Sequence, residues 1–285
     1  MKSGKDPFAE PMHYLPDAHR VRTMTTEELR ASFLVPELFQ PGQVTLRAID
    51  LDRVVLGGAV PVRESLRLEA PATMAAEFFT ERRELGVLNI GGAGRVRIGG
   101  EAHSMKNRDG LYVGRGNREI LFESDSAEEP ARFYLVSYPA HVSCPTRHIA
   151  RDRANVTELG TPEQANRRRL YKYIYPGGIE SAQLVMGITE LQEGSVWNTM
   201  PPHTHVRRTE VYLYFDLPDD AVVFHFLGEP AETRNVVVHD GEVALSPGWS
   251  IHAGSGTASY TFCWAMGGEN QEFADMQGFD MLTLR

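Results

Sequence analysis

The stretch Pro202-His203-Thr204-His205-Val206-Arg207-Arg208-Thr209-Glu210-Val211-Tyr212 decides the fold, together with Ser246-Pro247-Gly248-Trp249-Ser250-Ile251-His252 farther along the chain. The histidines and the glutamate in these stretches supply nitrogen and oxygen donors of the kind that bind transition metals. Two histidines one residue apart on an extended segment point to the same face, because side chains alternate along a strand. We therefore predict that one divalent metal ion is bound inside a β-barrel by His203, His205, Glu210 and His252.

The kinds of ligand do not select one metal. Three imidazoles and a carboxylate suit Zn, Fe, Mn, Co or Ni. Because the set contains no thiolate, we expect a coordination position that stays open for water or substrate, as is typical of catalytic sites. Other histidines, such as His225 and His239, have no ligand at a useful spacing and are predicted to be satisfied core residues.

Composition narrows the class of partner. The chain has 285 residues, a net charge of -9, 42% hydrophobic residues and 24% charged residues. An acidic chain has no broad basic surface for nucleic acid or an anionic membrane, so a small-molecule partner is favoured.

No apolar run is long enough to span a bilayer, and the first residues lack the apolar centre of a secretory signal. The cysteines Cys144 and Cys263 fall in no metal or redox spacing. They indicate buried thiols in a reducing compartment, and we expect a cytoplasmic protein.

Most of the chain reads as short strands. Apolar or alternating runs are separated by glycine and proline, as in sandwiches and barrels. Helical patterns are limited to residues 25–33, 161–170 and 72–80; the first begins with a threonine cap and the second has proline in its first turn. The fold class is therefore predicted to be all-β with a few short helices. The expected strands are residues 43–49, 54–56, 87–90, 110–113, 132–138, 183–188, 211–215, 222–227, 236–238, 243–245 and 260–265.

The two halves of the sequence resemble each other weakly. In each half, a strand and a glycine turn lead to an Asp-Gly turn and another strand, at residues 87–116 and 223–248. The pattern predicts an N-terminal arm over residues 1–40, a first barrel over 41–155 and a second barrel over 156–285. The first barrel is predicted to lack a metal site, because no His-x-His-x4-Glu precedes Leu85 and Ile120 stands where the second half has His252.

The order of these residues resembles the two motifs of the cupin superfamily. The first motif has a glycine, His-x-His and a glutamate, and the second has a glycine, a proline and a histidine. The matching positions are Gly194, His203, His205, Glu210, Gly241, Pro247 and His252. Two positions depart from the pattern, Leu217 for a glycine and Gly256 for an asparagine, and neither removes a ligand. The resemblance implies two tandem jelly-roll barrels.

A longer set of segments resembles the 5-keto-4-deoxyuronate isomerase family. These segments are residues 50–58, 191–205, 207–215, 232–234, 250–252 and 267–271. The resemblance implies a zinc-dependent ketol-isomerase of pectin breakdown that converts 4-deoxy-L-threo-5-hexosulose uronate (5-dehydro-4-deoxy-D-glucuronate) to 3-deoxy-D-glycero-2,5-hexodiulosonate. It also implies a homohexamer with one zinc ion per chain on the four ligands named above.

Further candidates follow from this chemistry. If Glu210 begins a strand, its alternation places Tyr212 near the metal as an acid or hydrogen-bond donor. Glu269 is a candidate base, against the alternative of a polar residue in a turn. Arg207 and Arg208 are candidates for binding the substrate carboxylate, since a guanidinium can bind it through two hydrogen bonds. Their alternative is a solvated turn or a salt bridge between subunits.

Two other functions remain compatible with the ligand set. An oxygen-using cupin oxidase or dioxygenase would employ the same ligands with iron or manganese. A sugar-binding cupin without catalysis would hold sugar acids and leave them unchanged. The sequence alone does not exclude either of them, because fold does not imply function.

Overall fold

The computed structural model describes residues 12–269 and 274–285. Within these ranges β-strands predominate, and the α-helices are α1 (Ala18–Val21) and α2 (Thr26–Phe33). The predicted all-β class is therefore confirmed. No α-helix in the described ranges is long and apolar enough to cross a membrane. The first eleven residues of the predicted arm, and Asn270 and Gln271 of the segments used above, lie outside the described residues.

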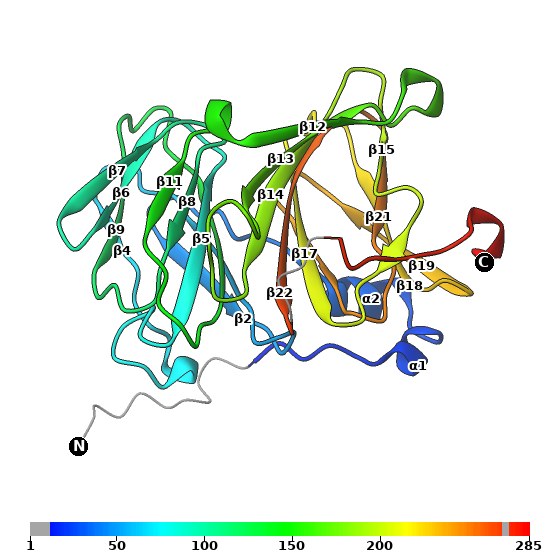
Figure 1. The fold of residues 1–285 in the computed structure, drawn as a ribbon, viewed down its shortest axis with the longest axis horizontal. Coiled ribbons are helices and arrows are strands. Elements are labelled where there is room, and N and C mark those ends of the chain that lie inside the picture. Colours follow the sequence, from blue (N-terminus) through cyan, green and yellow to red (C-terminus); the bar gives the residue numbers. More distant parts are fainter. Residues whose placement is uncertain (1–11, 270–273) are drawn as a thin grey trace. The chain divides into compact units, whose positions relative to one another are not determined.

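The chain forms two compact units, and each is assembled from separate stretches. Unit 1 contains residues 12–14, 38–153 and 177–184. Unit 2 contains residues 15–37, 154–176 and the described residues from 185 onward. Figure 1 shows both units as layered strands with few helices.

Unit 1 is a sandwich of two antiparallel sheets. An apolar cluster that includes Val87, Val96 and Phe133 combines side chains from both sheets. The larger sheet has the order β11 (Arg147–Ile149), β8 (Gly110–Val113), β5 (Arg83–Asn89), β10 (Phe133–Pro139), β3 (Val55–Ala59) and β2 (Val44–Ala48). The smaller sheet has the order β4 (Leu66–Arg67), β9 (Ile120–Ser124), β6 (Gly94–Ile98) and β7 (Glu101–Met105).

Unit 2 is also a sandwich, and it carries all four predicted metal ligands. Its larger sheet has the order β1 (Leu34–Val35), β20 (Val243–Ser246), β17 (Arg208–Phe215), β22 (Thr261–Gly268), β14 (Val185–Leu191), β13 (Arg168–Ile174) and β12 (Asn155–Leu159). The facing sheet has the order β15 (Trp197–Asn198), β21 (Ala253–Gly256), β18 (Val223–Glu229) and β19 (Glu232–Val238). A further pair joins β16 (His203–Thr204) to β23 (Gln277–Gly278).

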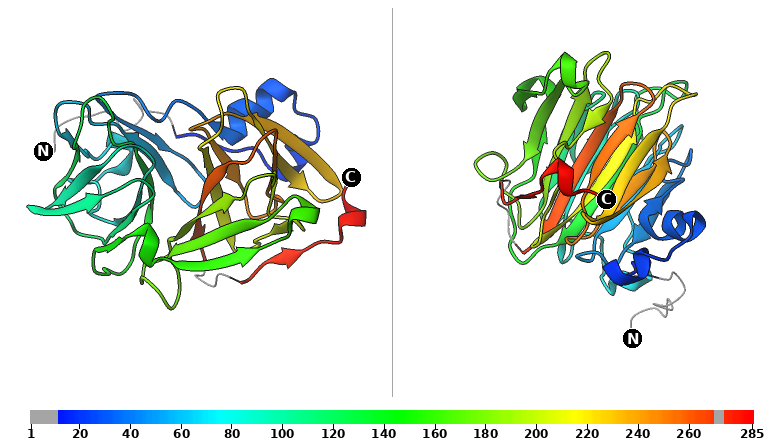
Figure 2. Two further views of the ribbon diagram at one scale, coloured as in Figure 1. Left: turned by 90° about the horizontal axis from the view of Figure 1, so that it is seen from above. Right: turned by 90° about the vertical axis from the view of Figure 1, so that its right-hand side faces the viewer.

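The core of unit 2 is rich in aromatic side chains. Tyr212, Tyr214 and Phe262 point from the larger sheet into an apolar cluster that also receives Val223 and Val236 from the facing sheet. Helix α2 packs against β19 and β20. Figure 2 shows the blue helical segment beside orange strands. This packing anchors β17, the strand that carries Glu210, in the apolar core of unit 2.

The helix expected at residues 25–33 is confirmed as α2. The side chain of Thr25 accepts a hydrogen bond from the backbone N–H of Glu28, and the Glu28 carboxylate accepts one from the N–H of Thr25. This reciprocal capping box satisfies two N–H groups that the helix itself leaves unpaired. Phe33, at the other end of the helix, is fully buried.

The other two helix predictions were wrong. At residues 161–170, proline starts only the 3-10 turn η3 (Pro162–Gln164), and Ala165 ends it with a φ of 52°. The chain then enters β13, where pairing with β14 overrides the helical preference of the local sequence. At residues 72–80 the helix is limited to the 3-10 turn η1 (Ala72–Met74).

Replacing the cap of α2 tests its contribution to stability. We expect Thr25→Ala to lower the free energy of unfolding by about 1 kcal/mol, because it removes the acceptor of the capping box. Thr25→Ser keeps that acceptor and is the matched control. Chemical denaturation of the three proteins measures the difference, and equal stability of Thr25→Ala and Thr25→Ser would show that the cap contributes nothing.

Candidate metal centre and active-site cavity

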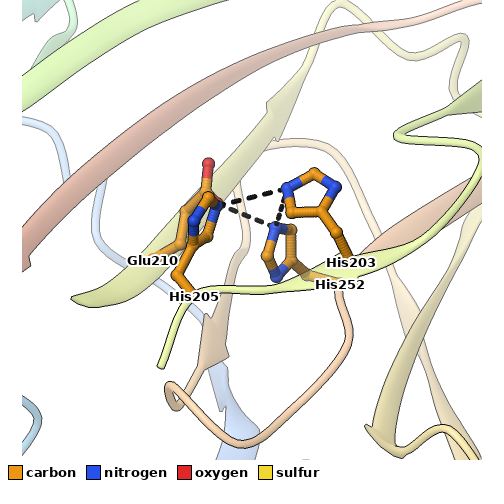
Figure 3. A group of neighbouring side chains, drawn as sticks. All are labelled: His203, His205, Glu210 and His252. Atoms are coloured by element: carbon orange, nitrogen blue, oxygen red, sulfur yellow. Dashed lines mark hydrogen bonds and ion pairs between the residues drawn. The ribbon is translucent and has the colours of Figure 1, made fainter. Parts of the chain in front are cut away.

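The four predicted ligands come together from three parts of unit 2 (Figure 3). His203 lies on β16 and His205 follows that strand directly. Glu210 lies near the start of β17, and His252 directly precedes β21. The four ligand atoms all lie within 4.8 Å of one another. The convergence that spacing alone predicted therefore exists in the folded chain.

Short distances join the four side chains around a common centre. His203 Nε2 is 3.2 Å from His205 Nε2 and 3.1 Å from His252 Nε2. The Glu210 carboxylate is 2.9 Å from His252 Nε2 and 3.3 Å from His205 Nε2. The same ring nitrogen of each histidine thus faces the centre. Three nitrogens and a carboxylate in this arrangement match the donor set of a divalent transition metal, so the group could hold such an ion.

Backbone pairing explains how the second motif reaches the first. In the β17–β20 ladder Glu210 is opposite Ser246, which places the turn after β20 beside the ligands. Gly248 lies in that turn, and a side-chain carbon there would come within 2.8 Å of the His205 carbonyl oxygen. Only glycine permits this close approach of two backbones. The turn then directs the chain to His252.

Burial and neighbouring charge give His203 and Glu210 the protonation states that a metal requires. Burial, together with the nearby His252, lowers the pKa of His203 from 6.5 to about 3. For Glu210, burial alone would raise the pKa, but His252 and His205 outweigh it and the pKa falls well below its usual range. At neutral pH, His203 is therefore neutral and Glu210 is ionised, as metal ligands must be.

His203, His205 and Glu210 line a cavity of about 260 Å³ within unit 2. Its walls are largely apolar, with Leu170, Phe262 and Trp264 among them. Tyr212 and Arg168 contribute polar groups to the same cavity. An apolar cavity with a few converging polar groups is typical of a small-molecule site.

His205 is supported from behind by a buried ion pair. The Arg208 guanidinium contacts the Asp275 carboxylate, and the two side chains are 0% and 15% exposed. His205 Nδ1 is 3.5 Å from the same Asp275 oxygen and 3.2 Å from Arg208. If Nε2 of His205 binds a metal, Nδ1 carries the hydrogen, and Asp275 is the acceptor that faces it. Such outer partners fix the ring orientation of a ligating histidine.

Comparison with known proteins identifies the family. A sequence profile of the KduI/IolB family matches residues 17–281. The chain belongs to the KduI/IolB family. It is similar to a 4-deoxy-L-threo-5-hexosulose-uronate ketol-isomerase from Opitutus terrae, with 50% identity over 96% of this chain and 99% of the relative. The family resemblance inferred from the residues is thereby confirmed.

Solved structures show the same fold at low identity. An IolB-like protein from Salmonella typhimurium LT2 superposes with a TM-score of 0.72 and 13% identity, over 87% of this chain and 96% of that chain. Oxalate decarboxylase from Lactobacillus farciminis superposes with a TM-score of 0.59 and 10% identity, over 84% and 87%. These cupin-like neighbours confirm the cupin fold class of this KduI/IolB member.

The other predicted site residues are found in different surroundings. Tyr212 lines the cavity, and its hydroxyl lies 3.1 Å from Thr199 Oγ1. Arg207 and Glu269 are exposed and lie 3.6 Å from each other, and neither lines the cavity. Arg208 is buried behind His205 and likewise does not line the cavity.

Sequence reasoning missed Arg168 and Asp275 in this KduI/IolB chain. Arg168 lies in a segment that the sequence analysis interpreted as a helix. The alternation of side chains along strand β13, which places Arg168 and Arg169 on opposite faces, was therefore not considered. Asp275 lies 67 residues from its partner Arg208 in sequence, and no motif connects them. A strand interpretation of residues 168–174 would have revealed the first. Only the tertiary structure reveals the second.

His225 is a satisfied core residue, as predicted, whereas the prediction for His239 was wrong. His225 is fully buried, and its Nδ1 lies 2.8 Å from the Tyr214 hydroxyl. Burial lowers the pKa of His225 from 6.5 to about 3. His239 is instead exposed and bonded to Glu242, because it lies in the turn that connects β19 and β20.

Removing the charge of Asp275 tests whether this carboxylate holds the ring of His205 in place for metal binding. We expect Asp275→Asn to weaken metal binding by about 10- to 100-fold, because the ring of His205 loses a charged acceptor. Competition with a chelator measures the affinity. Asp280→Asn is the control, since Asp280 lies on the same terminal segment and caps the turn η4 (Met281–Thr283). Unchanged affinity in Asp275→Asn would contradict the role.

The buried His225 should make the stability of the fold depend on pH. The folded chain favours the neutral imidazole, so the contribution of His225 to the free energy of unfolding is complete above pH 6.5 and is lost as the pH falls toward 3. We expect the unfolding free energy of His225→Gln to depend less steeply on pH in this range, by up to about 1.4 kcal/mol per pH unit. Denaturant unfolding at several pH values measures both slopes. Equal slopes would show that His225 is not protonated on unfolding.

Proposed function

We propose that this protein is a metal-dependent ketol-isomerase. It would convert 4-deoxy-L-threo-5-hexosulose uronate to 3-deoxy-D-glycero-2,5-hexodiulosonate during the breakdown of pectin-derived uronates. The observation that carries the proposal is the 50% identity, over 96% of this chain, to a relative that bears the name of this activity. The four converging ligands and the adjoining cavity supply a site of matching chemistry.

We propose that His203, His205, Glu210 and His252 hold the metal ion. The two buried rings of His205 and His252 are stacked at an interplanar angle of 15°, and the ring of His203 is edge-on to both. A bound divalent ion would supply electrostatic stabilisation for the negative charge that develops on substrate oxygens. Zinc is the metal implied by the family resemblance, and elemental analysis distinguishes it from Fe, Mn, Co and Ni.

Tyr212 is proposed as the hydrogen-bond donor for a substrate oxygen. Burial and the nearby Glu210 raise the pKa of Tyr212 well above 10, so its hydroxyl keeps its proton at neutral pH. A ketol isomerisation moves one proton between neighbouring carbons and another between their oxygens. Tyr212 fits a role at oxygen, because a phenol that keeps its proton can donate a hydrogen bond to a substrate oxygen but cannot take a proton from carbon. Glu269 stays a candidate base that would have to approach from its exposed position.

Two further expectations belong with this proposal. The first is a homohexamer, which the family resemblance implies. The second is a cytoplasmic location, which the free thiols of Cys144 and Cys263 support. Size measurement of the purified protein by light scattering tests the assembly. Fractionation of the producing cells tests the location.

Loss of one ligand tests the metal and the activity together. We expect His252→Ala to lose the bound metal and to reduce isomerisation by at least about 100-fold, because the set then lacks one buried donor. The exposed His239→Ala is the matched control and should keep both properties. Metal content is measured by elemental analysis and turnover by NMR. Full turnover by a metal-free His252→Ala protein would refute the proposed mechanism.

The same assay separates the rival functions. An isomerase keeps its rate without oxygen, whereas an oxidase or dioxygenase stops under anaerobic conditions. A non-catalytic sugar-binding protein would bind the uronate and leave its NMR spectrum unchanged. Turnover that is equal with and without oxygen therefore supports the isomerase and excludes both alternatives.

A further inference from the structure

Arg168 lines the same cavity as His203, His205 and Glu210, three of the four predicted ligands. It is the first residue of β13, and its side chain is half-buried. The cavity also contains the hydroxyl groups of Thr199 and Tyr212, while Leu170 and Trp264 contribute apolar surface. Among the described residues that line this cavity, Arg168 is the only arginine or lysine.

The charge of Arg168 has no acidic partner among the described residues. The one hydrogen bond of its side chain there runs from Nη1 to the backbone carbonyl oxygen of Asn166, at 2.8 Å. That bond positions the guanidinium and leaves other N–H donors for a ligand. Burial lowers the pKa of Arg168, and only the nearby phenol groups of Tyr212 and Tyr260 act against this change. A partly desolvated cation without a counter-ion is stabilised by an anion that enters the cavity.

Arg169, the next residue along β13, has different surroundings from Arg168. Arg169 points to the other face of β13, where it is exposed and lies 3.1 Å from Glu158. The two arginines are therefore equal in charge and adjacent in sequence, but one faces the cavity and the other faces solvent with an acidic partner. Arg207 and Arg208 are also each beside an acid, Glu269 and Asp275.

We propose that Arg168 binds the carboxylate of the sugar acid and so selects acids over neutral sugars. The proposal rests on the proposed function, because it identifies the residue that would recognise the substrate at that site. A guanidinium fork can donate two parallel hydrogen bonds to a carboxylate. The apolar walls strengthen this attraction, because little water competes there. The reacting carbonyl group would then be oriented toward the four ligands by an anchor on a different strand.

The test compares Arg168→Gln with Arg169→Gln, each in the metal-loaded protein. We expect Arg168→Gln to raise KM for 4-deoxy-L-threo-5-hexosulose uronate by about 10- to 100-fold, as for loss of a charge-assisted hydrogen bond. Arg169→Gln should leave KM unchanged. Metal content should stay equal in both, which separates a substrate role from damage to the centre. Arg168→Lys keeps the charge and loses the fork, and we expect an intermediate KM.

A second, uncharged substrate tests whether Arg168 recognises the negative charge of the carboxylate. The primary carboxamide of the same keto sugar has the shape of the acid without its charge. Binding of the acid and of the carboxamide is measured by calorimetry, and turnover of each by NMR. The wild-type protein should prefer the acid by at least about 10-fold, and Arg168→Gln should lose most of that preference. If Arg168→Gln does not fold, the same comparison with Arg168→Lys decides, with a reduced preference expected.

The outcomes separate this inference from the proposed function. If the wild-type protein binds the acid but does not isomerise it, the proposed function fails, and the loss of acid binding in Arg168→Gln still supports the inference. If the wild-type protein isomerises the acid and the Arg168 variants keep its KM and its preference for the acid, the inference is overturned. If the wild-type protein neither binds nor converts the acid, both are overturned.

Discussion

The burial of one carboxylate among three imidazoles is the constraint on which the rest of unit 2 depends. Glu210 is 4% exposed, and a buried carboxylate is strongly unfavourable unless it is paired. His205 and His252 approach it directly, and their attraction outweighs the desolvation that would otherwise protonate it. The three ring nitrogens converge with this carboxylate, so the four groups could share one partner at their centre. A divalent cation would satisfy all four groups at once.

The surrounding β-sandwich meets this constraint by holding the four side chains in fixed positions. Glu210 is in a central strand, between β20 and β22, so its backbone is held on both sides. The turn at Gly248 brings His252 to the same point, and the Arg208–Asp275 pair supports His205 from behind. Sites held by strands and by buried outer partners keep their geometry better than sites on free loops. The open side of the cluster faces a cavity in which a sugar acid could find both the proposed metal and Arg168.

Much of the fold and the core of the site could be predicted from the sequence. Each of the apolar runs interpreted as strands overlaps a strand in the structure, and α2 begins at the threonine cap that identified it. Local patterns succeed where the preference of the chain agrees with its tertiary surroundings. They failed at residues 161–170, where arginine and leucine favour a helix but pairing with β14 imposes a strand. That error concealed Arg168, because a helix and a strand assign different faces to the same residue.

What the sequence determined by itself was the kind and spacing of the ligands. His-x-His on an extended segment, followed by a glutamate on a strand, already requires convergent donors, since alternation along a strand is local geometry. Which arginine faces the cavity was decided only by the tertiary structure. Arg168, Arg207 and Arg208 are chemically identical, but the acids beside Arg207 and Arg208 come from distant segments, and so does most of the cavity wall around Arg168. Charge recognition depends on those long-range contacts, and local sequence does not encode them.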